Sequence, residues 1–234
     1  MKATHFVAHR GYPNRVTENT LESVKSAVEA GAHYVEVDIQ LTKDKEPVLF
    51  HDRTLHRLAG NEKAVHELNW PALQKLQLVQ SLPITHLEEL AEYIQTTKDV
   101  LFFIEIKRIS IEIFGVQLVV DIILQALEHV KEKYVAISYS HDALGYIRHQ
   151  SSIPVGFVID NWEERNSQDI INLNAEYLFC NLESLPKDKP VKFDNGKLVV
   201  FETEDPKVAY GLLQRGVDLV ETFSIGEMIQ AMTV

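Results

Sequence analysis

The sequence is poor in cysteine, with Cys180 as the single one among 234 residues. One thiol cannot close an intramolecular disulfide, which excludes the small secreted folds that disulfides hold together. Cys180 ends the apolar run 177–180, Tyr-Leu-Phe-Cys, a setting in which a cysteine typically packs in the core. We therefore expect a buried structural thiol and not a nucleophile.

The sequence also lacks long hydrophobic runs. No segment approaches the roughly 18 consecutive apolar residues that a membrane-spanning helix needs. The first residues, Met-Lys-Ala-Thr-His-Phe-Val, run directly into a predicted strand, without the apolar stretch and small-residue cleavage site of a secretory signal. These absences predict a cytoplasmic protein with no stable membrane association.

Positive charge is scarce, because 23 Lys and Arg residues stand against 34 Asp and Glu residues and leave a net charge of −11. A chain this acidic is repelled by nucleic acids and by anionic membranes, so neither is an expected partner. The expected partner is a small molecule, and any anionic group on it must be held by local positive charge. Self-association into a homo-oligomer stays open.

What the sequence does contain is typical of a globular α/β protein. Hydrophobic residues make up 45% and charged residues 24%, close to the averages for globular domains. Short β-rich runs alternate with amphipathic helical stretches. The β-rich runs are residues 4–9, 34–39, 100–106, 134–138, 155–159, 177–181, 197–202 and 218–222; the helical stretches are 18–30, 86–97, 113–131, 143–149, 164–173 and 206–215. Eight strands interleaved with helices predict a (β/α)8 TIM barrel.

Two segments depart from this regular alternation. Only residues 42–46 separate the strand-like runs 36–41 and 47–51, and a parallel crossover needs a dozen residues or more. That pair is therefore predicted to be a β-hairpin after the second strand, followed by an inserted segment at about 52–83. Residues 182–195 are polar and contain prolines, so they replace the expected sixth helix. With no clear linker or internal repeat, residues 1–234 are expected to form a single catalytic barrel domain.

Charged side chains stand at the predicted carboxyl-terminal strand ends, where the active sites of such barrels lie. His9-Arg10-Gly11 ends the first strand, the second carries Glu36 and Asp38, the hairpin returns at His51-Asp52, and the third ends in Glu105-Ile106-Lys107.

Residues two apart on a strand share a face, so Glu36, Asp38 and Glu105 are expected to converge inside the barrel. Carboxylates this close raise one another's pKa unless a cation compensates them. Oxygen ligands favour Mg²⁺ or Ca²⁺, with Mn²⁺ as a further candidate. The alternative is a structural ion network with Arg10 and Lys107.

The remaining rim residues suggest phosphoryl chemistry. Arg10 and Lys107 are suited to contact a phosphate, and His9 and His51 are the candidates for the general base and the general acid. Whether Asp52 orients His51 or faces outward is left open. Helix capping by Thr17 or Asn19 is the simplest role for the segment that follows Gly11.

These residues together resemble the glycerophosphodiester phosphodiesterase family. The resemblance rests on His9-Arg10-Gly11, Glu18-Asn19-Thr20, Glu36-Val37-Asp38, His51-Asp52 and Glu105-Ile106-Lys107, and it is strongest over residues 7–107. It implies a (β/α)8 barrel with an insertion after the His-Asp pair and metal-dependent hydrolysis of glycerophosphodiesters to glycerol 3-phosphate and an alcohol. The same resemblance implies Glu36, Asp38 and Glu105 as metal ligands, His9 and His51 as the acid/base pair, and Arg10 and Lys107 as phosphate contacts.

The last third of the chain departs from the pattern of that family. Phe201-Glu202-Thr203 stands where the family usually has a Trp-Thr-Val-Asn-like strand end, and Glu221-Thr222 stands where it commonly has Thr-Asp. Glu202 and Glu221 are expected to bring negative charge near the pocket, while Phe201 offers an apolar face. Two alternatives follow, a lysophospholipase-D-like phosphodiesterase and an inactive barrel that only binds a phosphorylated ligand. Whether water or a substrate hydroxyl attacks phosphorus is also left open.

Overall fold

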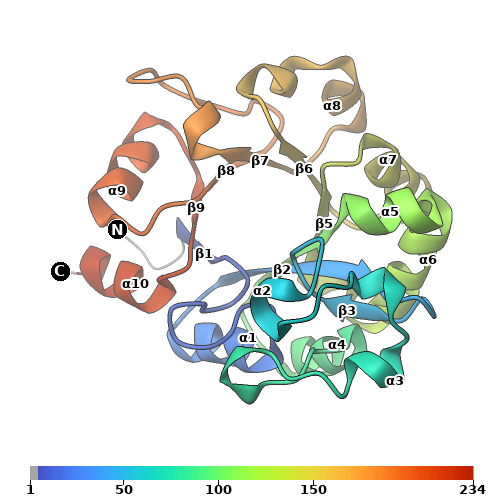
Figure 1. Ribbon diagram of the computed structural model, residues 1–234. Coiled ribbons are helices and arrows are strands. Elements are labelled where there is room, and N and C mark those ends of the chain that lie inside the picture. The colour runs from blue at the N-terminus through green and yellow to red at the C-terminus, as the bar shows by residue number, and fades with distance from the viewer. Residues whose placement is uncertain (1–4, 234) are drawn as a thin grey trace.

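Parallel strands form a closed ring in the computed structural model, which describes residues 5–233. Within these residues the ring consists of β1 (Phe6–Ala8), β2 (Tyr34–Leu41), β4 (Leu101–Ile106), β5 (Tyr134–Ser138), β6 (Val155–Ile159), β7 (Tyr177–Asn181), β8 (Lys197–Phe201) and β9 (Leu219–Thr222). β1 pairs in parallel with both β2 and β9, which closes the ring (Figure 1). The predicted (β/α)8 TIM barrel is confirmed. Residue 4, the first of the predicted strand 4–9, lies outside the described residues.

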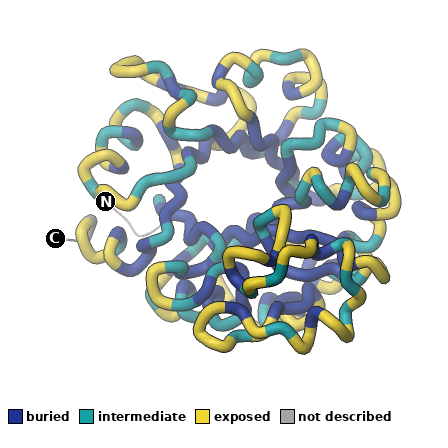
Figure 2. Tube along the Cα trace, viewed as in Figure 1, coloured by how far each residue is buried: buried dark blue, intermediate teal, exposed yellow. Residues whose placement is uncertain are grey.

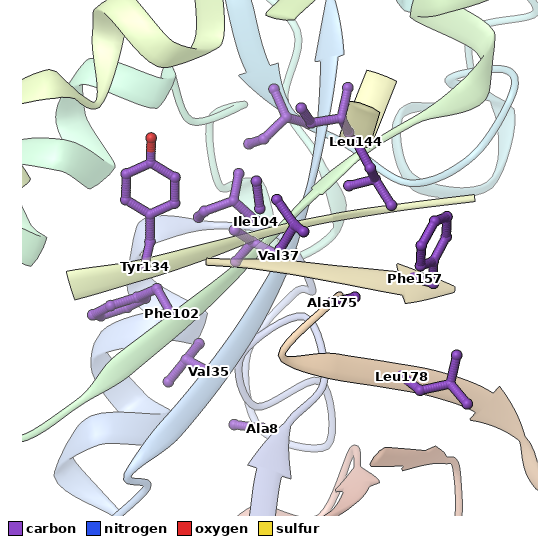
Figure 3. Close-up of a cluster of buried hydrophobic side chains, with 14 of the residues drawn as sticks. Ala8, Val35, Val37, Phe102, Ile104, Tyr134, Leu144, Phe157, Ala175 and Leu178 are labelled. Atoms are coloured by element: carbon purple, nitrogen blue, oxygen red, sulfur yellow. The ribbon is translucent and has the colours of Figure 1, made fainter. Parts of the chain in front are cut away.

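Alternation along the strands sorts the side chains into two layers. Val35, Val37 and Ile104 point outward and pack under the helices (Figure 3). Val7 and Phe103 point inward and pack in the barrel interior. Because strand side chains alternate between faces, the side chains two residues beyond an inward one also face the interior. This alternation directs the carboxylates of β2 and β4 into the barrel.

The ring strands are covered by helices on the outside. Their bounds are α1 (Leu21–Glu29), α4 (Leu87–Thr96), α5 (Arg108–Phe114), α6 (Val116–Ala126), α7 (His141–Gln150), α8 (Gln168–Leu173), α9 (Pro206–Arg215) and α10 (Ile225–Thr233). Figure 2 shows the strands as a buried ring and the helices with exposed outer faces. Among residues 5–233 no helix is long and apolar enough to cross a membrane. Cys180 is buried, as predicted.

Three helix predictions need correction. The predicted helix 113–131 is two helices, because Gly115 has φ of +85° and separates α5 from α6; the 3₁₀ helix η4 (Glu128–Lys133) follows them. The predicted helix 164–173 is a 3₁₀ turn, η5 (Trp162–Asn166), followed by α8. The predicted capping of the first helix is also wrong, because neither Thr17 nor Asn19 caps α1. Thr20 does so by accepting a hydrogen bond from the Ser23 backbone N–H.

The strand β3 (Pro47–Leu49) runs antiparallel to β2, with Leu49 opposite Ile39, so the predicted hairpin is confirmed. Beyond it the chain leaves the barrel before α4 and forms α2 (His56–Ala59), η2 (Val65–Glu67), α3 (Trp70–Leu73) and η3 (Val79–Ser81). These turns pack around a cluster of their own with Val48, Phe50 and Leu55. Residues 182–195, between β7 and β8, contain only the short η6 (Leu182–Ser184) among the described helices.

Candidate active site

The turn after β1 brings His9 and Arg10 to the carboxyl-terminal rim of the barrel. Arg10 has φ of +58° and Gly11 φ of +85°, so the chain reverses through left-handed backbone in two consecutive residues. The Arg10 N–H donates to Glu36 Oε2 at 3.1 Å, which fixes the turn against β2. A Cβ on Gly11 would lie 2.5 Å from Ser23 Oγ and 2.7 Å from the Ser23 carbonyl carbon. Gly11 is therefore required by space as well as by conformation.

Glu36, Asp38 and Glu105 meet inside the rim. Asp38 of β2 pairs directly with Glu105 of β4, and one ligand atom from each of the three residues lies within 4.8 Å of the others. All three are buried. Glu36 Oε1 is buried without a hydrogen-bond partner among the described residues, whereas Asp38 Oδ1 and Glu105 Oε1 are contacted by Lys107 Nζ. Oxygens of this kind fit a hard divalent cation.

The charges of this cluster are unevenly balanced. Burial, together with the charges of Asp38 and Glu221, holds the pKa of Glu36 well above its ordinary value. Burial also acts to raise the pKa of Asp38, but the positive charges of Lys107 and Arg10 outweigh it and the pKa of Asp38 is lowered. Burial raises the pKa of Glu105, although Lys107 opposes the shift. The positive charges of Lys107 and Arg10 therefore outweigh burial only at Asp38, and the pKa values of Glu36 and Glu105 stay raised.

Lys107 and Arg10 flank the carboxylates. Lys107 Nζ lies 3.0 Å from Asp38 Oδ1 and 2.9 Å from Glu105 Oε1. Arg10 Nε lies 3.5 Å from Asp38 Oδ2, and Arg10 Nη1 donates to Glu18 Oε1 at 2.8 Å. Arg10 and Lys107 thus pair with Asp38 and Glu105, as in the alternative of a structural ion network, while Glu36 Oε1 has no such partner among the described residues.

His9 is held between carboxylates and an aromatic ring. Its Nδ1 donates to Glu202 Oε2, and its Nε2 lies 3.7 Å from Glu36 Oε2. The imidazole stacks on Phe223 with centroids 4.9 Å apart. Burial lowers the pKa of His9, and the hydrogen bond to Glu202 opposes that shift. With Nδ1 occupied by a carboxylate, a neutral His9 presents the Nε2 lone pair to the rim.

His51 is also held by a carboxylate at Nδ1. Its Nδ1 donates to Asp52 Oδ1 at 2.9 Å, which settles that Asp52 binds His51. Asp52 also accepts from Arg57 of α2, with Arg57 Nε at 2.7 Å. A carboxylate on Nδ1 favours the tautomer in which Nε2 is free to accept a proton.

A cavity of about 400 Å³ opens over these groups, and its wall includes both histidines, Arg10, Glu36, Glu105 and Lys107. The predicted wall residues Phe201, Glu202 and Glu221 line it too. Burial and the charges of Glu202 and Glu105 hold the pKa of Glu221 well above its ordinary value. All the candidate residues chosen from the sequence thus meet at one rim, Asp38 from beneath the cavity floor.

Sequence analysis assigned no role in the site to several residues of the rim. Arg57 joins Glu18 and Asp52 from the segment after β3. Asn19 donates to Asp38 Oδ2 at 2.8 Å, although the sequence suggested a helix cap. Phe223 lies under His9. For Asn19 the Glu-Asn-Thr context was a usable signal, whereas no local pattern marks Arg57 or Phe223.

The (β/α)8 barrel gathers a carboxylate triad, two cations and two histidines at one rim, and each histidine is bound to a further carboxylate. This combination defines a class of barrel proteins suited to phosphoryl chemistry. The family model for the glycerophosphoryl diester phosphodiesterase family matches residues 9–223. The chain belongs to this family, as the sequence resemblance predicted.

Individual relatives agree with that family. The chain is 32% identical over 150 residues to the glycerophosphodiester phosphodiesterase of Caldanaerobacter subterraneus and 28% identical over 150 residues to the uncharacterised protein YqiK of Bacillus subtilis. Each match covers 60% of this chain and 60% of the relative. A phosphodiesterase of Oleispira antarctica, solved in complex with the product sn-glycerol-3-phosphate, superposes with a TM-score of 0.86 at 22% identity and covers 100% of both chains. At that identity the structural likeness shows the shared fold.

Proposed function

We propose that this chain is a metal-dependent phosphodiesterase that hydrolyses glycerophosphodiesters to glycerol 3-phosphate and an alcohol. One observation carries the proposal: His9 and His51 each hold a carboxylate at Nδ1 and line the same cavity as Glu36 and Glu105, two of the three carboxylates that fit a divalent cation. A phosphodiester displacement needs one base and one acid beside a centre of positive charge. Family membership and the names of the relatives support the same reaction.

In the proposed reaction, Glu36, Asp38 and Glu105 hold a divalent cation, for which Mg²⁺ and Ca²⁺ are the first candidates and Mn²⁺ a further one. Such a cation, when bound, polarises the phosphoryl group and offsets its charge. Arg10 and Lys107 contact the phosphoryl oxygens. These assignments leave the two imidazoles free for proton transfer.

One histidine accepts at Nε2 the proton of the attacking hydroxyl as the new P–O bond forms. The other donates a proton to the alcohol oxygen as the old P–O bond breaks, so that water and the diester yield glycerol 3-phosphate and the free alcohol. The attacking hydroxyl is that of water or of the substrate's own glycerol. In the second case a cyclic phosphate forms before hydrolysis, and we expect it to be detectable at short reaction times. We expect the reaction in the cytoplasm, with residues 1–234 acting as one catalytic domain.

The histidine roles are tested with His9→Ala and His51→Ala in an assay on glycerophosphocholine, glycerophosphoethanolamine and bis(p-nitrophenyl) phosphate. We expect each variant to lose roughly a hundredfold or more in kcat. His149→Ala serves as the matched control, because His149 is exposed at the end of α7.

Wild-type protein that binds glycerol 3-phosphate without turning over any diester would contradict the proposal and indicate a binding barrel. Preference for lysophosphatidylcholine over glycerophosphocholine would indicate the lysophospholipase-D-like alternative.

A further inference from the structure

Arg57 lies outside the barrel, on the short helix α2 that follows the hairpin, and it bridges two carboxylates. Its Nε and Nη2 donate to Asp52 Oδ2 and Oδ1 at 2.7 and 3.0 Å. Its Nη1 and Nη2 donate to Glu18 Oε2 and Oε1 at 2.8 and 2.7 Å. The whole guanidinium fork is therefore used in two bidentate pairs, the arrangement in which arginine fixes orientation best.

Each of these carboxylates also accepts a hydrogen bond from a residue of the proposed reaction. Asp52 Oδ1 accepts from His51 Nδ1 at 2.9 Å, and Glu18 Oε1 accepts from Arg10 Nη1 at 2.8 Å. An unbroken series of charge-assisted hydrogen bonds thus runs from the imidazole on the hairpin side to the guanidinium on the β1 side. Arg57 is its midpoint.

The two carboxylates differ in how much they depend on this bridge. The Glu18 side chain is 11% exposed, against 24% for Asp52 and 47% for Arg57. Burial acts to raise the pKa of Glu18, but its partners Arg57 and Arg10 hold that pKa below its ordinary value. A buried anion that loses one of its two guanidinium partners must recruit the other more fully or move toward water. Either response changes the contact between Glu18 and Arg10.

The segment that carries Arg57 also forms hydrogen bonds to Thr17, in the loop between β1 and α1 that carries Glu18. Gln80 Oε1 accepts from the Thr17 backbone N–H at 2.8 Å, and the Val79 carbonyl accepts from Thr17 Oγ1 at 2.7 Å. The loop between β1 and α1 is therefore anchored to residues 52–83 through Thr17 and through Glu18. Figure 1 shows α2 beside the barrel opening, near β1 and β2.

We propose that Arg57 is a positioning residue of the active site, which holds His51 through Asp52 and Arg10 through Glu18 at a fixed separation. The proposal rests on the proposed function, because it assigns Arg57 a part in the same reaction. It also gives the excursion after β3 a role, since this segment supplies the bridge between the two sides of the rim. A displacement of about 1 Å at such groups costs up to a hundredfold in rate.

The test compares Arg57→Ala and Arg57→Lys with Arg53→Ala as the matched control. Arg53 belongs to the same segment but is 77% exposed and pairs with Glu112 only at 3.6 Å. We expect both Arg57 variants to lose roughly ten- to a hundredfold in kcat and to raise KM, with melting temperatures close to that of Arg53→Ala. Lysine is expected to fail because one ammonium cannot form two bidentate pairs.

A readout without turnover separates this inference from the proposed function. The ¹⁵N–¹H signal of His51 Nδ1, assigned by its loss in His51→Ala, should be protected from solvent exchange in wild type and in Arg53→Ala and should be exchange-broadened in both Arg57 variants. Wild-type protein without turnover would overturn the proposed function and leave this spectroscopic test intact.

Two results would overturn the positioning role. One is wild-type kcat and an unchanged His51 signal in Arg57→Lys. The other is a lowered melting temperature in Arg57→Ala with unchanged kcat per folded molecule, which would make the bridge purely structural.

Discussion

At the scale of single residues, the site depends on how the backbone turns after β1. Arg10 and Gly11 take left-handed conformations in sequence, and this reversal places the His9 imidazole over Glu36 while the Arg10 side chain runs toward Glu18 and Asp38. The tripeptide His9-Arg10-Gly11 is thus one structural unit, in which the glycine lets the other two side chains diverge.

Gly11→Ala is expected to destabilise the protein more than Gly115→Ala. Both glycines have φ of +85°, but a Cβ on Gly115 meets nothing within 4 Å, whereas a Cβ on Gly11 meets Ser23. Gly115 has φ of +85° and ψ of +154°, a conformation adopted almost only by glycine and costing other residues about 1–3 kcal/mol. Gly115→Ala therefore measures a backbone cost without a clash, and Gly11→Ala adds the steric clash. The measurement is the free energy of unfolding from urea titration. Equal losses in the two variants would show that Ser23 does not restrict this position.

At the scale of elements, neighbouring strands of the barrel are tied by side chains that cross between them. Glu176, just before β7, accepts from the Val155 backbone N–H of β6 at 2.9 Å and from Arg148 of α7 at 2.7 Å. Burial acts to raise the pKa of Glu176, but these two hydrogen bonds outweigh it and lower the pKa.

A depressed folded-state pKa contributes stability above the unfolded-state pKa, and that stability is lost as the pH falls through the folded-state value. Glu176→Gln should therefore be less stable than wild type at pH 7, and the difference should shrink toward zero in acid. Since 42% of the side chain is exposed, the effect should stay below about 1 kcal/mol. Glu183→Gln, on an exposed side chain, is the control in denaturant titrations from pH 3 to 7. A difference that grew on acidification would contradict this role.

The elements also show how far the sequence predicts the fold. The helix 206–215 was predicted at its observed bounds because Pro206 can begin a helix and Gly216 can end one. The run 113–131 was predicted as one helix because its apolar spacing continues across Gly115, and the break depends on a backbone conformation that periodicity does not encode. The helix α10 was not predicted at all.

The same limit applies to the site. Glu36, Asp38 and Glu105 were predictable because strand alternation and the carboxyl-terminal rim bring them together. Arg57 was not, because its two carboxylates come from segments 39 and 5 residues away along the chain, and only the tertiary structure joins them.

At the scale of the whole molecule, the acidity of the chain extends into the site. A net charge of −11 repels anions at long range, so the proposed reaction assigns the capture of a phosphodiester to Arg10, Lys107 and a bound cation at the rim. Two further acidic groups face this rim, Glu221 of β9, which pairs with Val7 of β1, and Glu202 directly after β8, which accepts from His9. These acidic groups are a further reason for proposing a cation there.

We propose that this charge balance makes the reaction depend on a divalent cation at Glu36, Asp38 and Glu105. The direct measurement is glycerol 3-phosphate release from glycerophosphoethanolamine by chelator-treated protein, before and after addition of Mg²⁺, Ca²⁺ or Mn²⁺, in wild type and in Glu36→Gln. We predict no release in chelator, recovery with at least one of the three cations in wild type, and little recovery in Glu36→Gln. Equal release of glycerol 3-phosphate with chelator and with cation would show that the reaction does not depend on a divalent cation.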